Sequence, residues 1–340
     1  MNTIGLDAHS ATFTMAVLNH KGKLCYCKRW PTSETQLIDV VSTFTSPKQL
    51  VVEESHLAQW IKMTLEPYVD ELIVCDPRHN RWIAKDDFAN DRTSSIKLAQ
   101  LCRGGYIRRV YHPDEHGSEL RELFLHYCDL NQQITRFKLK LKGTFRRVGI
   151  PVSGQDIYRS EHRKDFLKTL ASYPHLIHQA NHLFTLIDSL EKMKGATLKA
   201  IVKRAKREPV YKLLLDMPGA GPVIASGYLA MIVTPYRFSK RNKLWRYSGL
   251  GNTYHESDCV VYKKSPSKSG NRILKWVVMQ HFQGAVARSK KLNRFKEQHL
   301  RLTGRGLTYK ESRRHVCRSI LSVVRAVWMK GEPYRKQTLR

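Results

Sequence analysis

The sequence predicts an α/β domain at the N-terminus, then long amphipathic helices, and then a mainly α-helical C-terminal domain. Three observations support this: alternating apolar residues early in the chain, a heptad stripe in its middle, and helix-like segments near its end. With 340 residues and 41% hydrophobic content, the chain is long enough for more than one folded core. We expect three domains, with the boundaries 1–112, 113–208 and 209–335.

The first 110 residues alternate strand-like and helix-like runs, which is typical of one sheet covered by helices. Ile4 and Leu6 are followed by alternating Phe13, Met15 and Val17, so we expect the domain to begin with a buried hairpin. Further strands are expected at KLCYCKRW, QLVVEES and ELIVCDP, and helices at AQWIKMTLEPYV and SIKLAQLCRGG.

Two apolar stripes at helical spacing follow, and both predict long helices. The segment YHPDEHGSEL supplies proline, glycine and a serine cap before the first stripe. The stripes consist of Leu120, Leu123, Tyr127, Leu130, Ile134, Phe137 and Leu141, and then of Leu176, Ala180, Leu183, Ile187 and Leu190. This pattern predicts two coiled-coil-like arms over residues 118–205. The two arms either pack against each other as a hairpin within one chain or mediate dimerisation.

The charge of the chain is strongly basic and unevenly distributed. Lys and Arg number 59 against 29 Asp and Glu, a formal net charge of +30. Residues 1–110 carry 14 basic and 12 acidic side chains, so residues 111–340 carry +28. This excess of positive charge predicts a polyanionic partner, and nucleic acid is favoured over a membrane surface. The alternative is a solvated basic protein of the ribosomal type.

Some classes of protein are not expected. No run of eighteen apolar residues occurs and the N-terminus enters a strand pattern directly, so we expect a cytoplasmic protein without a membrane span. The seven cysteines show no paired CxxC spacing, which predicts reduced thiols and neither a disulfide framework nor a zinc site.

Carboxylates follow two predicted strands and open one predicted helix. Asp7 ends the first strand, and Glu53 and Glu54 end a later one, but alternation lets only one glutamate face the side of Asp7. The acidic residues that open the predicted helix are Asp86, Asp87 and Asp91. Asp7, Glu53 and Asp91, in a ribonuclease-H-like order, predict a divalent-metal site for phosphoryl transfer on nucleic acid. For a single acid, a helix cap or surface charge is the alternative, which we favour at Asp86.

The segment LLLDMPGAGPVIASGYLAMI predicts a helix-hairpin-helix. One helix is expected to end near Met217 and the next to begin at Pro222. Gly219 and Gly221 between them would let backbone amides approach a phosphate at a helix N-terminus. The alternative is a plain turn between two helices.

A basic segment with several serines follows the hairpin, and we expect it to be a loop that holds phosphate. Its candidate nucleophiles are Ser257, Ser265, Ser267 and Ser269, and its candidate nucleic-acid-binding cations are Lys268 and Arg272. No His/Asp relay is visible from the spacing, although His255 lies two residues before Ser257. The residues by themselves do not choose among the serines.

Taken together, six motifs resemble a known family. Their order resembles that in insertion-sequence transposases with a RuvC-like, DEDD-type acidic domain. The six motifs are IGLDAHS, VVEES and DRTSSIKLAQLCRGG and, after a heptad linker, MPGAGPVIAS, RYSGLGN and KSGNRILKW. That family is related to Piv-type DNA invertases and carries a separate serine-bearing transposase domain. The resemblance covers most of the chain.

The resemblance implies a recombinase whose RuvC-like domain, of ribonuclease H fold, binds Mg²⁺ through four acidic residues. A serine of its C-terminal domain attacks DNA and forms a phosphoserine. It also implies pairing of a structured bridge RNA with target and donor DNA, and homo-dimers or homo-tetramers with catalytic parts from different subunits. By motif, Asp7, Glu53 and Asp91 take the first three acidic places. Ser257 matches the serine, although Asp258 stands where a glycine is usual.

The fourth acidic place departs from the family pattern Asp-x-x-Asp-Ala, because DRTSS puts Ser94 there. Asp87 would supply the missing oxygen if the helix begins early enough; Ser94 would bind metal through a water; or activity is lost. The leading hypothesis is an RNA-guided, Mg²⁺-dependent DNA transposase or recombinase. The alternatives are a catalytically silent nucleic-acid-binding relative and a RuvC-like junction nuclease.

Overall fold

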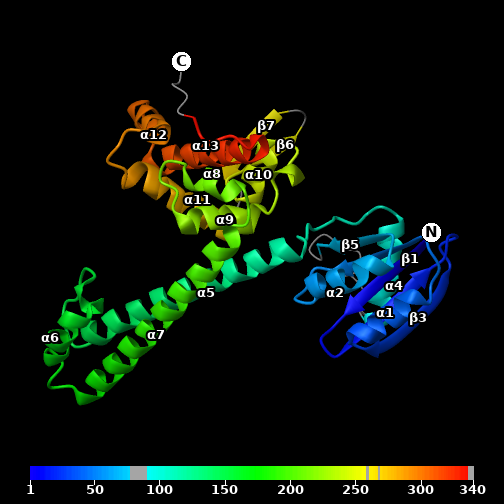
Figure 1. Ribbon diagram of the computed structural model, residues 1–340, viewed down its shortest axis with the longest axis horizontal. Coiled ribbons are helices and arrows are strands. Elements are labelled where there is room, and N and C mark those ends of the chain that lie inside the picture. Colours follow the sequence, from blue (N-terminus) through cyan, green and yellow to red (C-terminus); the bar gives the residue numbers. More distant parts are fainter. Residues whose placement is uncertain (77–89, 258–259, 267–268, 336–340) are drawn as a thin grey trace. The chain divides into compact units, whose positions relative to one another are not determined.

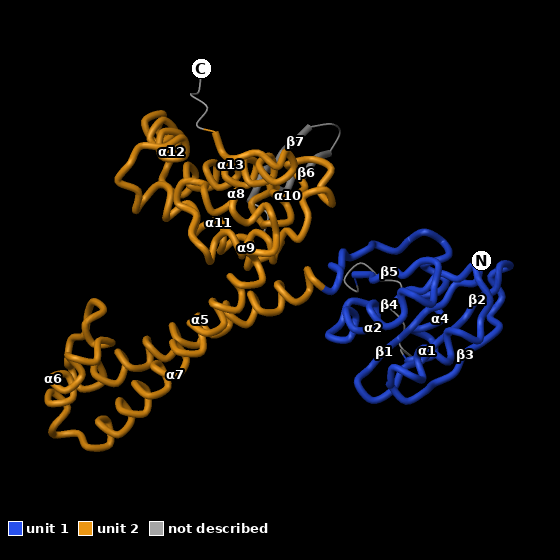
Figure 2. The backbone as a smooth tube through the Cα atoms, viewed as in Figure 1, with its two compact units in different colours: residues 1–115 blue, residues 116–340 orange. Residues whose placement is uncertain are grey.

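The computed structural model describes residues 1–76, 90–257, 260–266 and 269–335. The chain forms two compact units, residues 1–115 and 116–340 (Figure 2). The helical segment expected as a domain of its own, 113–208, belongs almost entirely to the second unit. Four of the candidate residues lie outside the described residues: Asp86, Asp87, Ser267 and Lys268.

Unit 1 contains one mixed sheet of five strands, in the order β3-β2-β1-β4-β5 (Figure 1). β1 pairs antiparallel with β2 and parallel with β4, and β5 continues the parallel side. The five predicted strands are thereby confirmed. The elements are β1 Asn2–Ala8, β2 Thr12–Leu18, β3 Leu24–Pro31, α1 Glu34–Ser42, β4 Lys48–Glu53, α2 Ala58–Leu65, β5 Glu71–Cys75 and α4 Asp91–Arg103.

Helices cover both faces of this sheet. Ile4 and Leu6 of β1 point into a core shared with α1 and α2. On the opposite face α4 packs against β1 and β2, and its Leu98 joins a smaller core with Val51 of β4. Helix α1 was not expected from the sequence, although Ser33 caps it by accepting a hydrogen bond from the backbone N–H of Gln36.

Unit 2 begins with two long helices, α5 Glu115–Arg146 and α7 Pro174–Ala205, which run antiparallel. Side-chain hydrogen bonds along the length of the two helices show their alignment: Arg204 with Glu119, Lys138 with Glu191, and Thr144 with Gln179. At the far end, beside the short helix α6 Arg163–Lys168, the two stripes bury their apolar residues against each other. The two stripes therefore form a closed hairpin within one chain.

The rest of unit 2 is mainly helical and shares a core with the near ends of α5 and α7. Between α10 and α11 the structure has an antiparallel hairpin, β6–β7, where we expected a basic loop. The elements are α8 Val210–Leu215, α9 Pro222–Ile232, α10 Arg241–Tyr247, β6 Asn252–Ser257, β7 Val260–Pro266, α11 Arg272–Phe282, α12 Arg294–Gly304 and α13 Tyr309–Lys330.

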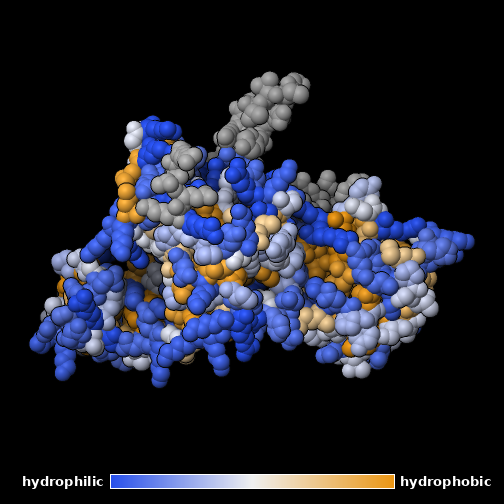
Figure 3. All heavy atoms as spheres, turned by 45° about the horizontal axis from the view of Figure 1, so that its top comes forward, coloured by the Kyte–Doolittle hydropathy of each residue, from blue (hydrophilic) through white to orange (hydrophobic). Residues whose placement is uncertain are grey.

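Hydrophilic residues cover most of the molecular face in Figure 3, and hydrophobic residues are visible only between them. Within the part of the chain that the structure describes, no helix combines the length and the apolar character that crossing a membrane requires.

Candidate active site

The acidic site of unit 1 depends on how closely α4 approaches β1. A Cβ atom at Gly5 would overlap the carbonyl oxygen of Ser95 and lie 2.7 Å from the backbone nitrogen of Ala99. Only glycine leaves room for the helix there. Because Gly5 and Asp7 are two residues apart on one strand, Asp7 also faces the α4 side of the sheet.

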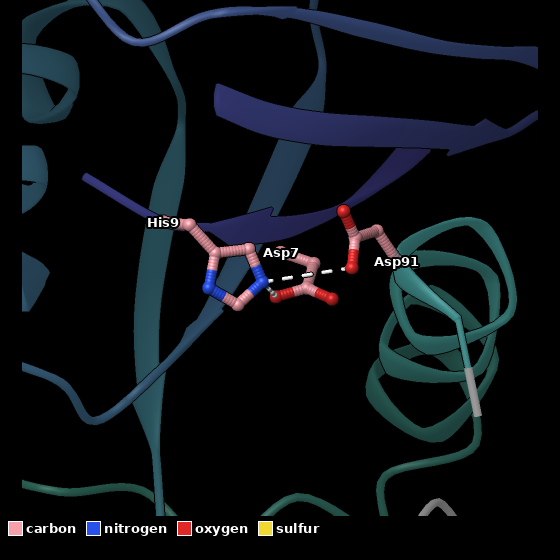
Figure 4. A group of neighbouring side chains, drawn as sticks. All are labelled: Asp7, His9 and Asp91. Atoms are coloured by element: carbon pink, nitrogen blue, oxygen red, sulfur yellow. Dashed lines mark ion pairs between the residues drawn. The ribbon is translucent and has the colours of Figure 1, made fainter. Parts of the chain in front are cut away.

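Asp7, His9 and Asp91 come together at this place, and Figure 4 shows their side chains pointing toward one another. His9 Nε2 lies 3.4 Å from Asp7 Oδ1 and 3.6 Å from Asp91 Oδ1. Arg29 of β3 approaches the other oxygen of Asp91, with Nη2 at 3.6 Å. His9 and Arg29 were not among the site residues expected from the sequence, although His9 lies in the motif IGLDAHS.

Asp91 is the first residue of α4. The side chain of Asn90 accepts a hydrogen bond from the backbone N–H of Thr93, at 2.8 Å. Asn90 has an extended backbone and is the N-cap, so the helix begins after it. A carboxylate in the first turn is favoured by the helix dipole, so this position holds a negative charge at little cost.

Register decides which glutamate joins Asp7. Leu6 pairs with Val52 in the parallel β1–β4 ladder, so Glu53 follows on the same face as Asp7. Glu54 turns elsewhere and contacts Nε2 of His112. The structure thus brings Asp7, Glu53 and Asp91 to one end of the sheet.

The carboxyl group of Asp7 has a raised pKa, first because it is partly buried and further because Asp91 and Glu53 are close. His9 acts in the opposite direction and lowers this pKa. The side chain of Asp7 is 20% exposed, against 34% for Asp91. This is a cluster of like charges that needs a positive charge beside it.

The donor set fits a divalent cation. One ligand atom from each of Asp7, His9 and Asp91 lies within 4.8 Å of the others. Carboxylate oxygens suit hard ions such as Mg²⁺ and Mn²⁺, whereas the imidazole nitrogen of His9 suits a transition metal better. The two carboxylates are thus the natural ligands for a hard ion, and Glu53 is close enough to influence Asp7.

Comparison with protein families agrees with this geometry. A family model described as "Transposase", of the DEDD type of IS110 elements, matches residues 4–150. A second one, described as "Transposase IS116/IS110/IS902 family", matches residues 211–300. The chain is a transposase of the IS110 family. No curated protein is similar enough to count as a match.

Membership in this family makes the chain a DNA transposase, and its DEDD-type domain implies dependence on a divalent metal ion. In the transposase, the match over residues 4–150 includes Asp7, Glu53 and Asp91, and the match over residues 211–300 includes Ser257.

The fourth acidic place is occupied by Ser94, half-buried on α4 and one turn after Asp91. The sequence makes Asp87 its substitute if the same helix begins that early. The helix begins at Asp91, and Asp87 lies outside the described residues. The Asn90 cap is the sequence signal that marks this boundary.

Ser257 is the last residue of β6, and its backbone pairs with Val260 of β7. Ser265 pairs with Thr253, nearer the open end of the hairpin, and Ser269 is exposed just before α11. Ser257 and Ser265 therefore stand at different levels of one hairpin, and Ser269 follows it.

Two glycine motifs hold the base of this hairpin. A Cβ at Gly270 would overlap Gly249, so RYSGLGN and KSGNRILKW pack directly on each other. The backbone N–H of Asn271 donates to the carbonyl of Tyr247 at 2.6 Å, and Arg272 then begins α11 with its side chain exposed.

The turn between α8 and α9 joins two helices as predicted, and Gly219 lies in it at a point of close packing. Its φ is +81°, and a Cβ there would overlap the backbone of Ala285. Gly219 thus serves close packing inside the protein. Gly221, which precedes α9, has open space where a Cβ would point.

A buried hydrogen-bond chain fixes this turn. Tyr228 donates to Nδ1 of His281 at 2.8 Å, and Nε2 of His281 donates to the carbonyl of Pro218 at 3.0 Å. Both ring nitrogens of His281 are satisfied in its neutral form. Its complete burial lowers the pKa of His281 to about 4.

Proposed function

We propose that this transposase cleaves and rejoins DNA at the ends of its insertion sequence, with Mg²⁺ held by Asp7, Glu53 and Asp91 and with Ser257 as the nucleophile. The observation that carries the proposal is the convergence of Asp7 and Asp91, which come from β1 and α4, beside His9. Like charges gathered at a strand end are costly unless a cation or a charged substrate group balances them.

The bound cation would polarise the phosphate and neutralise charge as it develops. The protein's own residues do the rest: the two aspartates would orient the cation, and Arg29 offers positive charge beside Asp91. Ser257 Oγ forms a bond to phosphorus and loses its proton, while the deoxyribose oxygen leaves and takes one. Because the phosphoserine keeps a phosphodiester linkage, a second hydroxyl can rejoin the strand.

We further infer that a structured non-coding RNA guides the enzyme, as in the family it resembles. The +28 charge of residues 111–340 supports a large polyanionic partner, because counterion release rewards clustered cations. Lys268 and Arg272 lie beside the serine hairpin in sequence, and the α8–α9 turn would meet the DNA backbone at Gly221. Homo-dimers or homo-tetramers would let a serine of one copy act with the acids of another.

For the fourth acidic place we propose Asp87 as the ligand, with Ser94 acting through a water as the second choice. One observation favours a silent relative that only binds nucleic acid, namely Ser94 in an acidic position. Ser94→Asp separates these proposals: transposition should rise if the site is merely weakened, and should stay absent in a silent protein.

The test is transposition of the element with its native flanking DNA, followed by isolation of protein bound covalently to DNA. Wild type should give an adduct, and Ser257→Ala should give neither adduct nor transposition. Ser265→Ala, on the same hairpin, and Ser269→Ala, just after it, are the matched controls and should keep both the adduct and transposition. An adduct that survives in Ser257→Ala and vanishes in a control variant would show that the serine replaced in that control is the nucleophile.

A further inference from the structure

A basic pocket of about 370 Å³ lies among α10, α12 and α13 of unit 2. Its basic residues come from all three helices: Arg241 from α10, Arg294 from α12, and His315 and Arg318 from α13. Among the residues that the structure describes, no aspartate or glutamate lines it. Within the described residues, no carboxylate forms an ion pair with Arg241 or Arg294. Such a concentration of one charge favours an anion.

The pocket also has a rigid aromatic wall, Trp245. The indole Nε1–H donates to the carbonyl of Arg318 at 3.0 Å and contacts Ser322 Oγ at 3.2 Å, which sets the plane of the ring. The guanidinium groups of Arg241 and Arg318 lie 5.6 Å and 5.7 Å from its centre. Val323 adds apolar surface. The pocket thus combines cations with a surface on which a flat ring can stack.

Arg318 connects this pocket to the strand that carries Ser257. Its Nε donates to the carbonyl of Leu250 at 2.7 Å, and its Nη2 donates to the side chain of Asn252 at 2.6 Å. Asn252 begins β6, and Ser257 ends it. At about 3.3 Å per residue, the strand spans roughly 17 Å between them, about five steps of a stacked nucleic-acid strand.

We propose that this pocket binds one unpaired nucleotide of a nucleic-acid strand, with the phosphate at Arg241, Arg294 and Arg318 and the base against Trp245 and Val323. The volume is that of a small-molecule site, which a nucleotide fills and a duplex does not enter. The bound nucleotide would hold the strand beside Arg318, which contacts the start of β6, the strand that ends at Ser257. The proposal rests on the proposed function only in taking nucleic acid as the ligand.

The test measures binding of the full chain to fluorescent oligonucleotides in EDTA, where no cleavage occurs. The variant is Arg241→Gln with Arg294→Gln; the control is Arg301→Gln, an exposed arginine on α12 outside the pocket. The pocket variant should bind a single strand at least about tenfold more weakly and show a shallower salt dependence, by about one to two in the log–log slope. Arg301→Gln should change affinity less than twofold.

Trp245→Leu tests the stacking wall. Affinity for a single strand should fall about fivefold or more, while affinity for a strand of abasic residues should be unchanged. Arms with single-stranded DNA and single-stranded RNA identify which strand the pocket receives. Equal losses for Arg301→Gln and the pocket variant, or equal losses for duplex and single strand, would overturn the proposal. Because EDTA removes the metal, failure of the acidic site leaves this result unaffected.

Discussion

The acidic site of unit 1 and the basic pocket of unit 2 are opposite in charge and are built in different ways. Asp7 and Asp91 are positioned by the backbone: a glycine lets α4 reach β1, and the strand register brings Glu53 alongside. The cations of the pocket are positioned by side chains, through the hydrogen bonds of Trp245 and Arg318. The acidic site should therefore be sensitive to backbone changes, and the pocket to side-chain changes.

The largest effect should follow from removing a carboxylate of the acidic site. Asp91→Asn should reduce DNA cleavage by more than about 100-fold, because even outer-shell partners of a metal are worth 10–100-fold. Cleavage assays over a series of Mg²⁺ and Mn²⁺ concentrations measure it. Glu54→Gln, next to Glu53 but turned toward His112, is the matched control and should keep most activity. Equal loss in both would break the assignment.

Gly5→Ala tests whether the backbone builds the acidic site. The added methyl group overlaps the carbonyl oxygen of Ser95, so we expect a loss of about 3 kcal/mol in the stability of unit 1, together with weaker cleavage. Thermal unfolding is the measurement. Gly195→Ala on α7, where a Cβ meets nothing within 4 Å, should instead stabilise the protein by about 0.5–1 kcal/mol. Stable Gly5→Ala protein would refute the close approach of α4.

The pH dependence of unit 2 should reveal its buried histidine. The folded pKa of His281 is about 4, below its usual 6.5, so the unfolded chain binds more protons between these values. Stability is thus complete above pH 6.5 and is lost as the pH falls toward 4, by up to about 3 kcal/mol. Urea unfolding from pH 7 to 4.5 measures it. His281→Gln should flatten the profile; an unchanged slope would exclude His281 as its source.

Gly219→Ala and Gly221→Ala distinguish packing from ligand approach within one turn. Gly219 has a positive φ and no space for a Cβ, so its replacement should cost about 2 kcal/mol of stability. Gly221 has open space, so Gly221→Ala should leave the melting temperature nearly unchanged and weaken DNA binding alone. A destabilised Gly221→Ala with normal DNA binding would contradict this division.

The smallest effect should come from the repulsion among the acids. Without metal, Asp7→Asn should leave stability unchanged or raise it by less than about 1 kcal/mol, since its carboxyl already has a raised pKa. With Mg²⁺, wild type should gain melting temperature and Asp7→Asn should gain less. Scanning calorimetry with and without Mg²⁺ makes the comparison. A destabilised Asp7→Asn without any response of wild type to metal would indicate that His9 alone balances Asp7.

The sequence by itself determined what depends on neighbouring residues. Alternation around Ile4 and Phe13 predicted the strands, apolar stripes predicted α5 and α7, and the uneven charge predicted a polyanion. The carboxylates at strand ends were found in the same way, because alternation and strand ends are local properties of the chain.

Only the tertiary structure decided what depends on distant residues meeting. His9 and Arg29 became part of the acidic site through packing of β1, β3 and α4. The role of Gly219 depends on Ala285, and the basic pocket on three helices that no sequence motif relates. The β6–β7 hairpin was missed because its cationic residues resemble a loop. Such contacts follow from the packing of whole elements, which short-range patterns do not encode.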